Sequence, residues 1–162
     1  MEENVNTGLS PEVRAASAAL LNGLLADHFV AMLKIWQFHW NVVGKSFGSY
    51  HEDMRKLYDE EFDRVDDIAE RIRALGMRPL GSLDQMLKYN TVPEYPQEQP
   101  VPSPLQMWQY ISADWDTLIR RAHGVHATIS EQDIATRSFL EGMCEDMEKT
   151  AWMIRARVEV GE

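Results

Sequence analysis

Cysteine is almost absent from this chain of 162 residues, and the single Cys144 excludes a disulfide within the chain. A lone thiol inside an apolar helical pattern is typical of a reducing compartment, and we expect the cytoplasm. No run of 18 apolar residues occurs, so we expect no membrane span. The opening stretch MEENVNTGLSPEV has neither a basic region nor an apolar core, so we expect no signal peptide.

Basic residues are also few. The chain has 16 Lys and Arg against 26 Asp and Glu, which gives a formal net charge of −10. The first 13 residues contain three acidic residues and no Lys or Arg. Because binding to phosphate groups depends on such cations, we predict no DNA binding. The same excess of negative charge favours the attraction of cations.

No segment alternates apolar and polar residues as a half-buried strand would. The helical period is present instead, and it places Trp36 and Phe62 on apolar faces. Gly76 is predicted to end the second helix as its C-terminal cap. Four long helices are expected: from Pro11 onward, from about Ser49 to Leu75, from near Pro104 to Ser130, and from about Glu131 to Val158.

Residues 77–104 hold six of the seven prolines and are expected to form a crossover, with a short helix over Ser82–Tyr89. Two helices joined by a short turn, a long crossover and two more helices predict an all-α, ferritin-like four-helix bundle. We expect residues 1–162 to form one such domain, with a short acidic extension over residues 1–9. Apolar residues beyond one stripe indicate either a wide core face or contact between subunits.

A bundle of this kind commonly holds two metals in its middle through Glu-x-x-His pairs. No glutamate here has a histidine three residues later, so we expect no such site. The remaining candidate ligands are His39 and His51, on either side of a glycine-bearing turn, and Asp66 and Glu70, on one helical face. His51 and Asp66 are 15 positions apart on one helix, which corresponds to roughly 22 Å.

Side chains cannot bridge that separation to reach one metal. Either the histidines and the carboxylates are unrelated, or a second copy completes each site across a two-fold axis. If the histidines and the carboxylates are unrelated, ordinary structural roles explain both. Histidines near helix ends are often structural, and Asp66 and Glu70 continue an acidic, solvated stripe that includes Asp59 and Asp63.

Three stretches, HWNVVGKSFGSYHE, DDIAERIRALGMRPLGSL and EDMEKTAWMIRARV, resemble the DNA-binding proteins from starved cells, the Dps family or mini-ferritins. The resemblance implies a hollow homododecamer that oxidises ferrous iron with hydrogen peroxide and stores the ferric mineral, which protects against oxidative stress. It also implies ferroxidase sites between subunits. His39 and His51 would come from one chain, and Asp66 and Glu70 from its two-fold neighbour.

Arg55 departs from the family pattern, which usually has a carboxylate four residues after the second histidine. A guanidinium cannot ligate iron. The alternative is therefore a Dps-like shell with weakened or lost ferroxidase activity that binds metal or has a structural role. We expect Glu52 or water to substitute as a ligand, and Trp40 to lie near the iron. Further carboxylates are candidates for iron-entry pores (Asp133, Glu141 and Glu145) and for mineral nucleation (Asp59, Glu60 and Asp63).

Overall fold

The computed structural model describes residues 5–160, and every regular element in that range is a helix. The elements are α1 (Pro11–Asn41), α2 (Phe47–Ala74), α3 (Leu83–Tyr89), α4 (Pro104–Thr128) and α5 (Ile134–Val160). They confirm the predicted all-α bundle, in which a long crossover containing a short helix joins α2 to α4. Of the expected extension over residues 1–9, residues 1–4 lie outside the described range, and the others precede α1.

Side-chain caps fix where two of the long helices begin. Ser10 accepts a hydrogen bond from the amide of Val13 at the start of α1. Ser103 accepts one from the amide of Gln106 at the start of α4, while the Gln106 side chain accepts from the Ser103 amide, which completes a capping box. Each cap is followed by proline at the first helical position, where its missing N–H costs nothing.

The end of α2 and the start of α5 show one success and one error. Gly76 has φ +79°, and the amide that follows it donates back into the last turn at 3.2 Å, as a glycine cap requires. The predicted start of the last helix at Glu131 is wrong. The helix begins at Ile134 because Asp133 accepts the Thr136 amide at 3.1 Å and so acts as an N-terminal cap.

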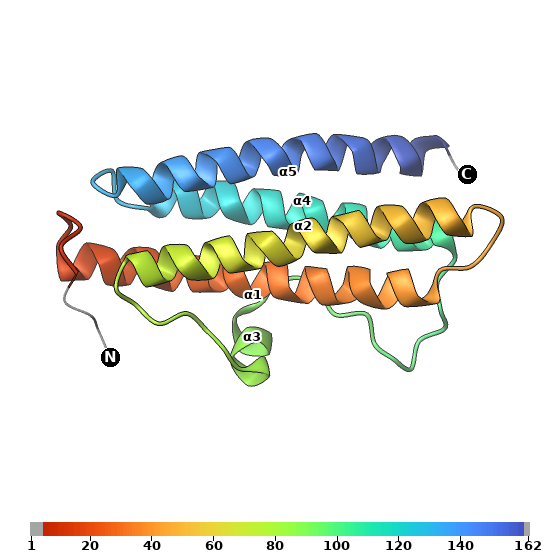
Figure 1. Cartoon of the computed structure of the whole chain (residues 1–162), viewed down its shortest axis with the longest axis horizontal. Helices are drawn as coiled ribbons and strands as arrows, with labels where there is room; N and C mark the ends of the chain where they lie inside the picture. Colours follow the sequence, from red (N-terminus) through yellow and green to blue (C-terminus); the bar gives the residue numbers. More distant parts are fainter. Residues whose placement is uncertain (1–4, 161–162) are drawn as a thin grey trace.

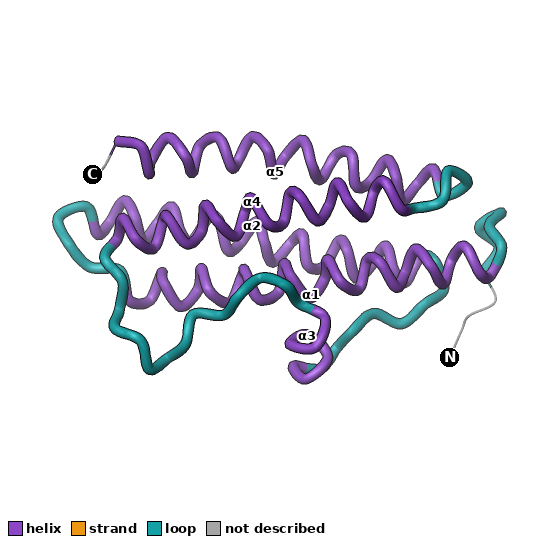
Figure 2. The backbone as a smooth tube through the Cα atoms, turned by 180° about the vertical axis from the view of Figure 1, so that it is seen from behind, coloured by secondary structure: helices purple, strands orange, loops and turns teal. Residues whose placement is uncertain are grey.

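The four long helices pack in two antiparallel pairs, α1 with α2 and α4 with α5 (Figure 1). Helix α1 also packs against α4, and the crossover that carries α3 runs along the outside of α1 (Figure 2). Helix α1 is apolar over a stretch long enough to cross a bilayer, but 67% of that stretch is buried in the bundle. Its apolar residues therefore form the core rather than a membrane span.

Trp36 and Phe62 do not belong to this core. Trp36 is 39% exposed and Phe62 is 63% exposed, so their predicted place on inward faces is wrong. Leu33 and Trp40, which are also exposed, lie near Trp36 along α1. Large apolar side chains that gather outside a well-filled core are typical of interaction surfaces. A wide core face does not explain these residues, and contact between subunits stays a prediction for them.

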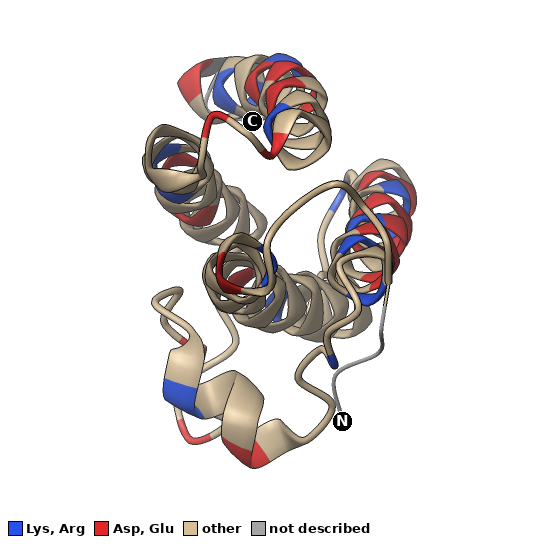
Figure 3. Ribbon diagram, turned by 90° about the vertical axis from the view of Figure 1, so that its left-hand side faces the viewer, with Lys and Arg blue, Asp and Glu red and all other residues tan. Residues whose placement is uncertain are grey.

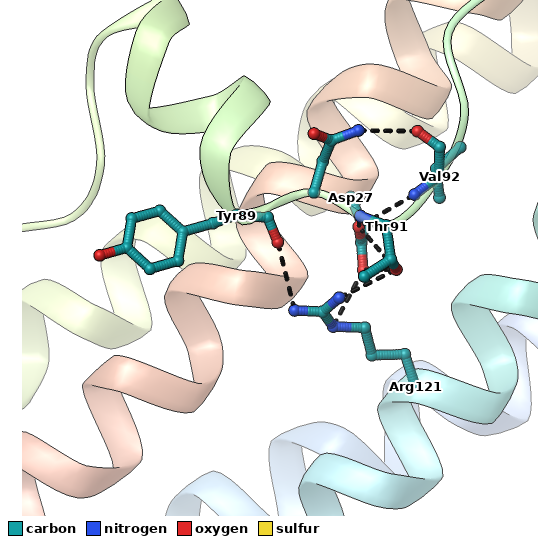
Figure 4. Close-up of polar contacts among 6 residues, drawn as sticks. Asp27, Tyr89, Thr91, Val92 and Arg121 are labelled. Carbon is teal, nitrogen blue, oxygen red and sulfur yellow. Dashed lines mark hydrogen bonds and ion pairs between the residues drawn. The ribbon is translucent and has the colours of Figure 1, made fainter.

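An ion pair with a buried carboxylate holds the crossover against the bundle (Figure 4). Asp27 of α1 is fully buried and lies 3.0 Å from Nε of Arg121, which comes from α4. Asp27 also accepts hydrogen bonds from the hydroxyl of Thr91 at 3.1 Å and the amide of Val92 at 3.3 Å. Arg121 donates in turn to the Tyr89 carbonyl at 3.3 Å. These contacts of Asp27 and Arg121 hold the chain that leaves α3 against α1 and α4.

Gly23 leaves room for Arg121 to reach Asp27, because a methyl group at Gly23 would overlap the guanidinium. We predict that Gly23→Ala destabilises the fold by about 1–3 kcal/mol, the range of a charged hydrogen-bond group. In an Arg121→Ala background the same change should stabilise by about 0.5–1 kcal/mol, as alanine normally does inside a helix. Thermal unfolding of the four proteins at one concentration measures both effects, and stabilisation in both backgrounds would refute the prediction.

Candidate metal site

Two imidazoles meet where α1 ends and α2 begins. His39 donates from Nδ1 to the backbone carbonyl of His51 at 2.8 Å, and His51 donates from Nδ1 to the carbonyl of His39 at 3.0 Å. The rings are stacked, with centroids 3.7 Å apart and planes 25° apart. Because a carbonyl only accepts, each Nδ1 carries the hydrogen, and in the neutral rings each Nε2 keeps its lone pair.

This arrangement is the one that metal-binding histidines use. A ligating imidazole usually donates its other N–H to a carbonyl or carboxylate, which fixes the tautomer and the orientation of the ring. Here the backbone supplies both acceptors reciprocally, so each residue orients the other. Gly44, with φ +126°, lies in the short turn that brings the two helix ends together. His39 is 7% exposed, so neighbouring residues surround most of the side chain.

Aromatic side chains lie beside the histidines. The ring of Tyr58 is edge-on to His39 at 5.1 Å, and Trp36 lies 5.6 Å from Tyr58. Trp40 was expected near the metal; its described ring contact is with Trp36, at 5.3 Å, and it is 60% exposed. Tyr58 was missed by the sequence analysis because its contact with His39 depends on how α1 and α2 pack.

Asp66 and Glu70 lie on α2, far from the histidines that the structure brings together. Both are exposed, and α2 is one uninterrupted helix from Phe47 to Ala74, so the roughly 22 Å separation of His51 and Asp66 stands. Charged residues crowd this helix (Figure 3). Within residues 5–160, no three His, Cys, Asp or Glu side chains are grouped closely enough to hold a metal. The two predicted sets of ligands therefore lie at separate places on one chain.

Of the other acidic residues near His51, one has a close basic partner and two make only long contacts with cations. Asp53 lies 2.8 Å from Nη1 of Arg157, and Glu52 lies 4.0 Å from the Lys56 ammonium. Arg55, one turn after His51, has its Nε 3.7 Å from Asp59, and both of these side chains are 58% exposed. The contact between Arg55 and Asp59 is longer than a hydrogen bond.

A histidine–carboxylate pair lies inside the bundle, and the sequence analysis missed it. Nδ1 of His28 lies 2.7 Å from Oε2 of Glu61, both side chains are fully buried, and Arg64 binds the other oxygen of Glu61. Bundles with metals in their middle use carboxylates and imidazoles from facing helices. In this position the chain has one imidazole, His28, and one carboxylate, Glu61. The positive charge beside them comes from the guanidinium of Arg64.

The charge of Glu61 is held by its partners. Burial alone raises the pKa of its carboxyl group, but His28 and Arg64 more than offset this, and the pKa lies below its usual value. Nε2 of His28 has no hydrogen-bond partner within the described residues. The only sequence signal for this pair was a histidine on the apolar face of α1.

An acidic groove of about 590 Å³ separates α2 from α5. Glu60 and Asp63 line it together with Asp67 and Asp146, whereas Asp59 does not. Burial raises the pKa of Glu60, and the nearby charges of Glu61 and Asp146 add to the rise.

One of the three pore candidates is wrong. Asp133 is 1% exposed, caps α5 and lies 3.1 Å from Arg71, so it does not face solvent in the chain. Glu141 is exposed and lies 2.8 Å from Nε2 of His126. Glu145 is exposed as well, so both remain predictions for a pore.

Known proteins resemble this chain in sequence and in fold. The ferritin-like domain family matches residues 18–162. An uncharacterised low temperature-induced protein of Nostoc is 37% identical over 157 residues, which cover 96% of this chain and 87% of that protein. DNA protection during starvation protein 2 of Bacillus anthracis is 32% identical over 138 residues, covering 85% of this chain and 92% of that protein.

Among solved structures, a Dps protein from Bacillus brevis superimposes with a TM-score of 0.84 at 28% identity, over 93% of this chain and 99% of that chain. The fold, the paired histidines and the relatives agree with the resemblance found in the sequence. The chain belongs to the Dps family of ferritin-like proteins.

Proposed function

We propose that this protein oxidises ferrous iron with hydrogen peroxide at sites shared between two copies, stores the ferric product and thereby limits oxidative damage. The reciprocal hydrogen bonds of His39 and His51 carry the proposal, because they leave two ligand nitrogens oriented for a metal. Imidazole and carboxylate are ligand types that suit Fe(II) and leave positions open for an oxidant. Membership of a ferritin-like family supports iron as the metal.

The carboxylates of each site would come from Asp66 and Glu70 of a second copy. Their exposure, and the exposed Trp36 and Phe62 between the two ends of the site, support an interface along α1 and α2. A two-fold interface buries the same surface on both copies and forms two equivalent sites. In a closed shell of twelve chains, the acidic groove between α2 and α5 supplies carboxylates to bind ferric product if it faces the interior.

Arg55 favours one alternative, a shell in which oxidation is weakened or lost and which binds metal or serves as structure. Its guanidinium lies one turn from His51 and is only distantly paired, so it repels a cation approaching the imidazoles.

Light scattering and iron kinetics test both proposed functions. We expect a particle of about 220 kDa, twelve chains of 18.7 kDa. We also expect saturable, peroxide-dependent formation of ferric absorbance, faster than in buffer. Oxidation at the buffer rate by an intact particle would favour the alternative.

We also propose that the protein does not bind DNA and works in the reducing cytoplasm, where Cys144 stays a thiol. Members of the family are named for DNA protection, but the first 13 residues of this chain have no Lys or Arg. DNA binding requires cations that neutralise phosphates, and the chain carries a charge of −10. In a gel-shift assay at low salt, plasmid mobility should be unchanged at any protein ratio. Retardation would contradict this.

A further inference from the structure

The paired histidines bring no negative charge to a metal. Two neutral imidazoles fill two positions of a divalent ion and add no negative charge, so in the proposed site only Asp66 and Glu70 of a second copy offset the charge of the ion. The first charged side chain further along the same face of α2 is the guanidinium of Arg55, four residues after His51, where Cβ atoms are about 5–6 Å apart. A metal at the imidazoles and the guanidinium would therefore repel each other across a short gap.

The guanidinium of Arg55 has N–H donors available for a ligand. Its nearest acidic neighbour in the described chain is Asp59, at 3.7 Å, which is beyond hydrogen-bond distance. Asp53 is paired with Arg157 at 2.8 Å, whereas Glu52 lies 4.0 Å from the Lys56 ammonium, which is also beyond hydrogen-bond distance. Guanidinium groups bind carboxylate, sulfate and similar oxyanions through two parallel N–H donors. A fork with this chemistry, one turn from two metal-type nitrogens, is suited to an anion that a metal also binds.

We propose that Arg55 and a metal at His39 and His51 bind one small oxyanion between them, so that the anion replaces the carboxylate that the chain lacks there. This inference rests on the proposed function. One oxygen of the anion binds the metal, and the others accept hydrogen bonds from Arg55. The anion removes the repulsion between the two cations and adds a charge-assisted contact. The oxyanion is free in solution, which distinguishes it from a carboxylate of a second copy.

Cobalt titration of the assembled protein tests this, because Co(II) takes imidazole and oxygen ligands and its visible absorbance reports binding directly. Titrations in sodium sulfate and in sodium chloride are compared at equal ionic strength. We expect the Kd for Co(II) to be about tenfold lower in sulfate, the effect of one charge-assisted contact. Acetate should act as sulfate does. Arg55→Ala should abolish the difference between the salts and should bind Co(II) more weakly than the wild type does in sulfate.

Two further variants make the result specific. Lys56→Ala removes the same charge one residue along α2, away from the histidine face, and should keep the full sulfate effect. Arg55→Asp places a carboxylate on that face and should bind Co(II) equally well in both salts. If the wild type binds Co(II) equally in sulfate and chloride, the inference is overturned and the proposed function stands.

Other outcomes are equally decisive. Tighter binding by Arg55→Ala in both salts would mean that the guanidinium only repels the metal or pairs with carboxylates of a second copy, and would overturn the inference. A sulfate effect that survives in Arg55→Ala would place the anion elsewhere. Absence of cobalt binding by the wild type in every salt would overturn the inference and the proposed function together.

Discussion

Glu61→Gln is expected to destabilise the protein by about 3 kcal/mol and to lower its Tm by roughly 6–12 °C. Glu61 is fully buried between His28 and Arg64, and the change removes the negative charge while keeping the shape of the side chain. Breaking a buried ion pair from one side leaves its partner's charge unpaired in a poorly solvating interior. Thermal unfolding at a fixed protein concentration, which matters for an assembly, gives the comparison.

Glu60→Gln is the matched control, the same chemical change one residue away on the groove side of α2. It should leave the Tm within about 1 °C or raise it slightly, because burial and neighbouring carboxylates disfavour the charge of Glu60. Equal effects of the two substitutions would show that the pair of His28 with Glu61 contributes no particular stability.

The same pair gives a pH dependence with a defined sign. The pKa of Glu61 is lowered in the folded protein, so its contribution is complete above its unfolded value of 4.5 and is lost as the pH falls through the folded pKa. The Tm difference between the wild type and Glu61→Gln should therefore shrink below pH 4.5. A constant difference down to strongly acidic pH would contradict this.

The fold was predictable because its signals are local. Serine caps followed by proline, a glycine at the end of α2 and the helical period each act over a few neighbouring residues. The two histidines were found because a short turn joins their helices. The distance from His51 to Asp66 needed only the rise of a helix, and α2 is continuous over that range.

The errors and omissions have a different origin. His28 and Glu61 are 33 positions apart, and Asp27 and Arg121 still further, so their pairing depends on how helices pack. Trp36 and Phe62 have the same helical period as core residues, and sequence periodicity cannot tell an apolar core face from an apolar exposed face. Such features depend on tertiary or quaternary contacts that no local pattern records.

The strongest test of a shared site is complementation between two inactive chains. One chain carries His39→Ala and His51→Ala, and the other carries Asp66→Asn and Glu70→Gln. If each site takes its histidines from one copy and its carboxylates from the other, either chain alone should oxidise iron only at the buffer rate. Both carboxylates are exposed and both substitutions preserve shape, so little change in stability is expected.

Coexpression of the two chains with different affinity tags yields mixed particles. With random pairing, half of the dimers are mixed, and each mixed dimer has one complete site and one empty of all four side chains. About a quarter of the wild-type sites should therefore return, measured as Fe(II) oxidised in the first saturable phase per particle. A site contained within one chain predicts no recovery at all, since neither chain is then complete.

Asp59→Asn with Asp63→Asn is the control for the carboxylate chain, because these residues have the same spacing in the same acidic stripe. That variant should retain the wild-type amount of Fe(II) oxidised in the first saturable phase, which counts oxidation sites and excludes the later growth of mineral. Full oxidation by the chain altered at Asp66 and Glu70 would make those residues ordinary solvated charges and leave His39 and His51 without their partners. Recovery near a quarter, with this control unaffected, requires that imidazoles and carboxylates meet across an interface, because the length of α2 keeps them apart within one chain.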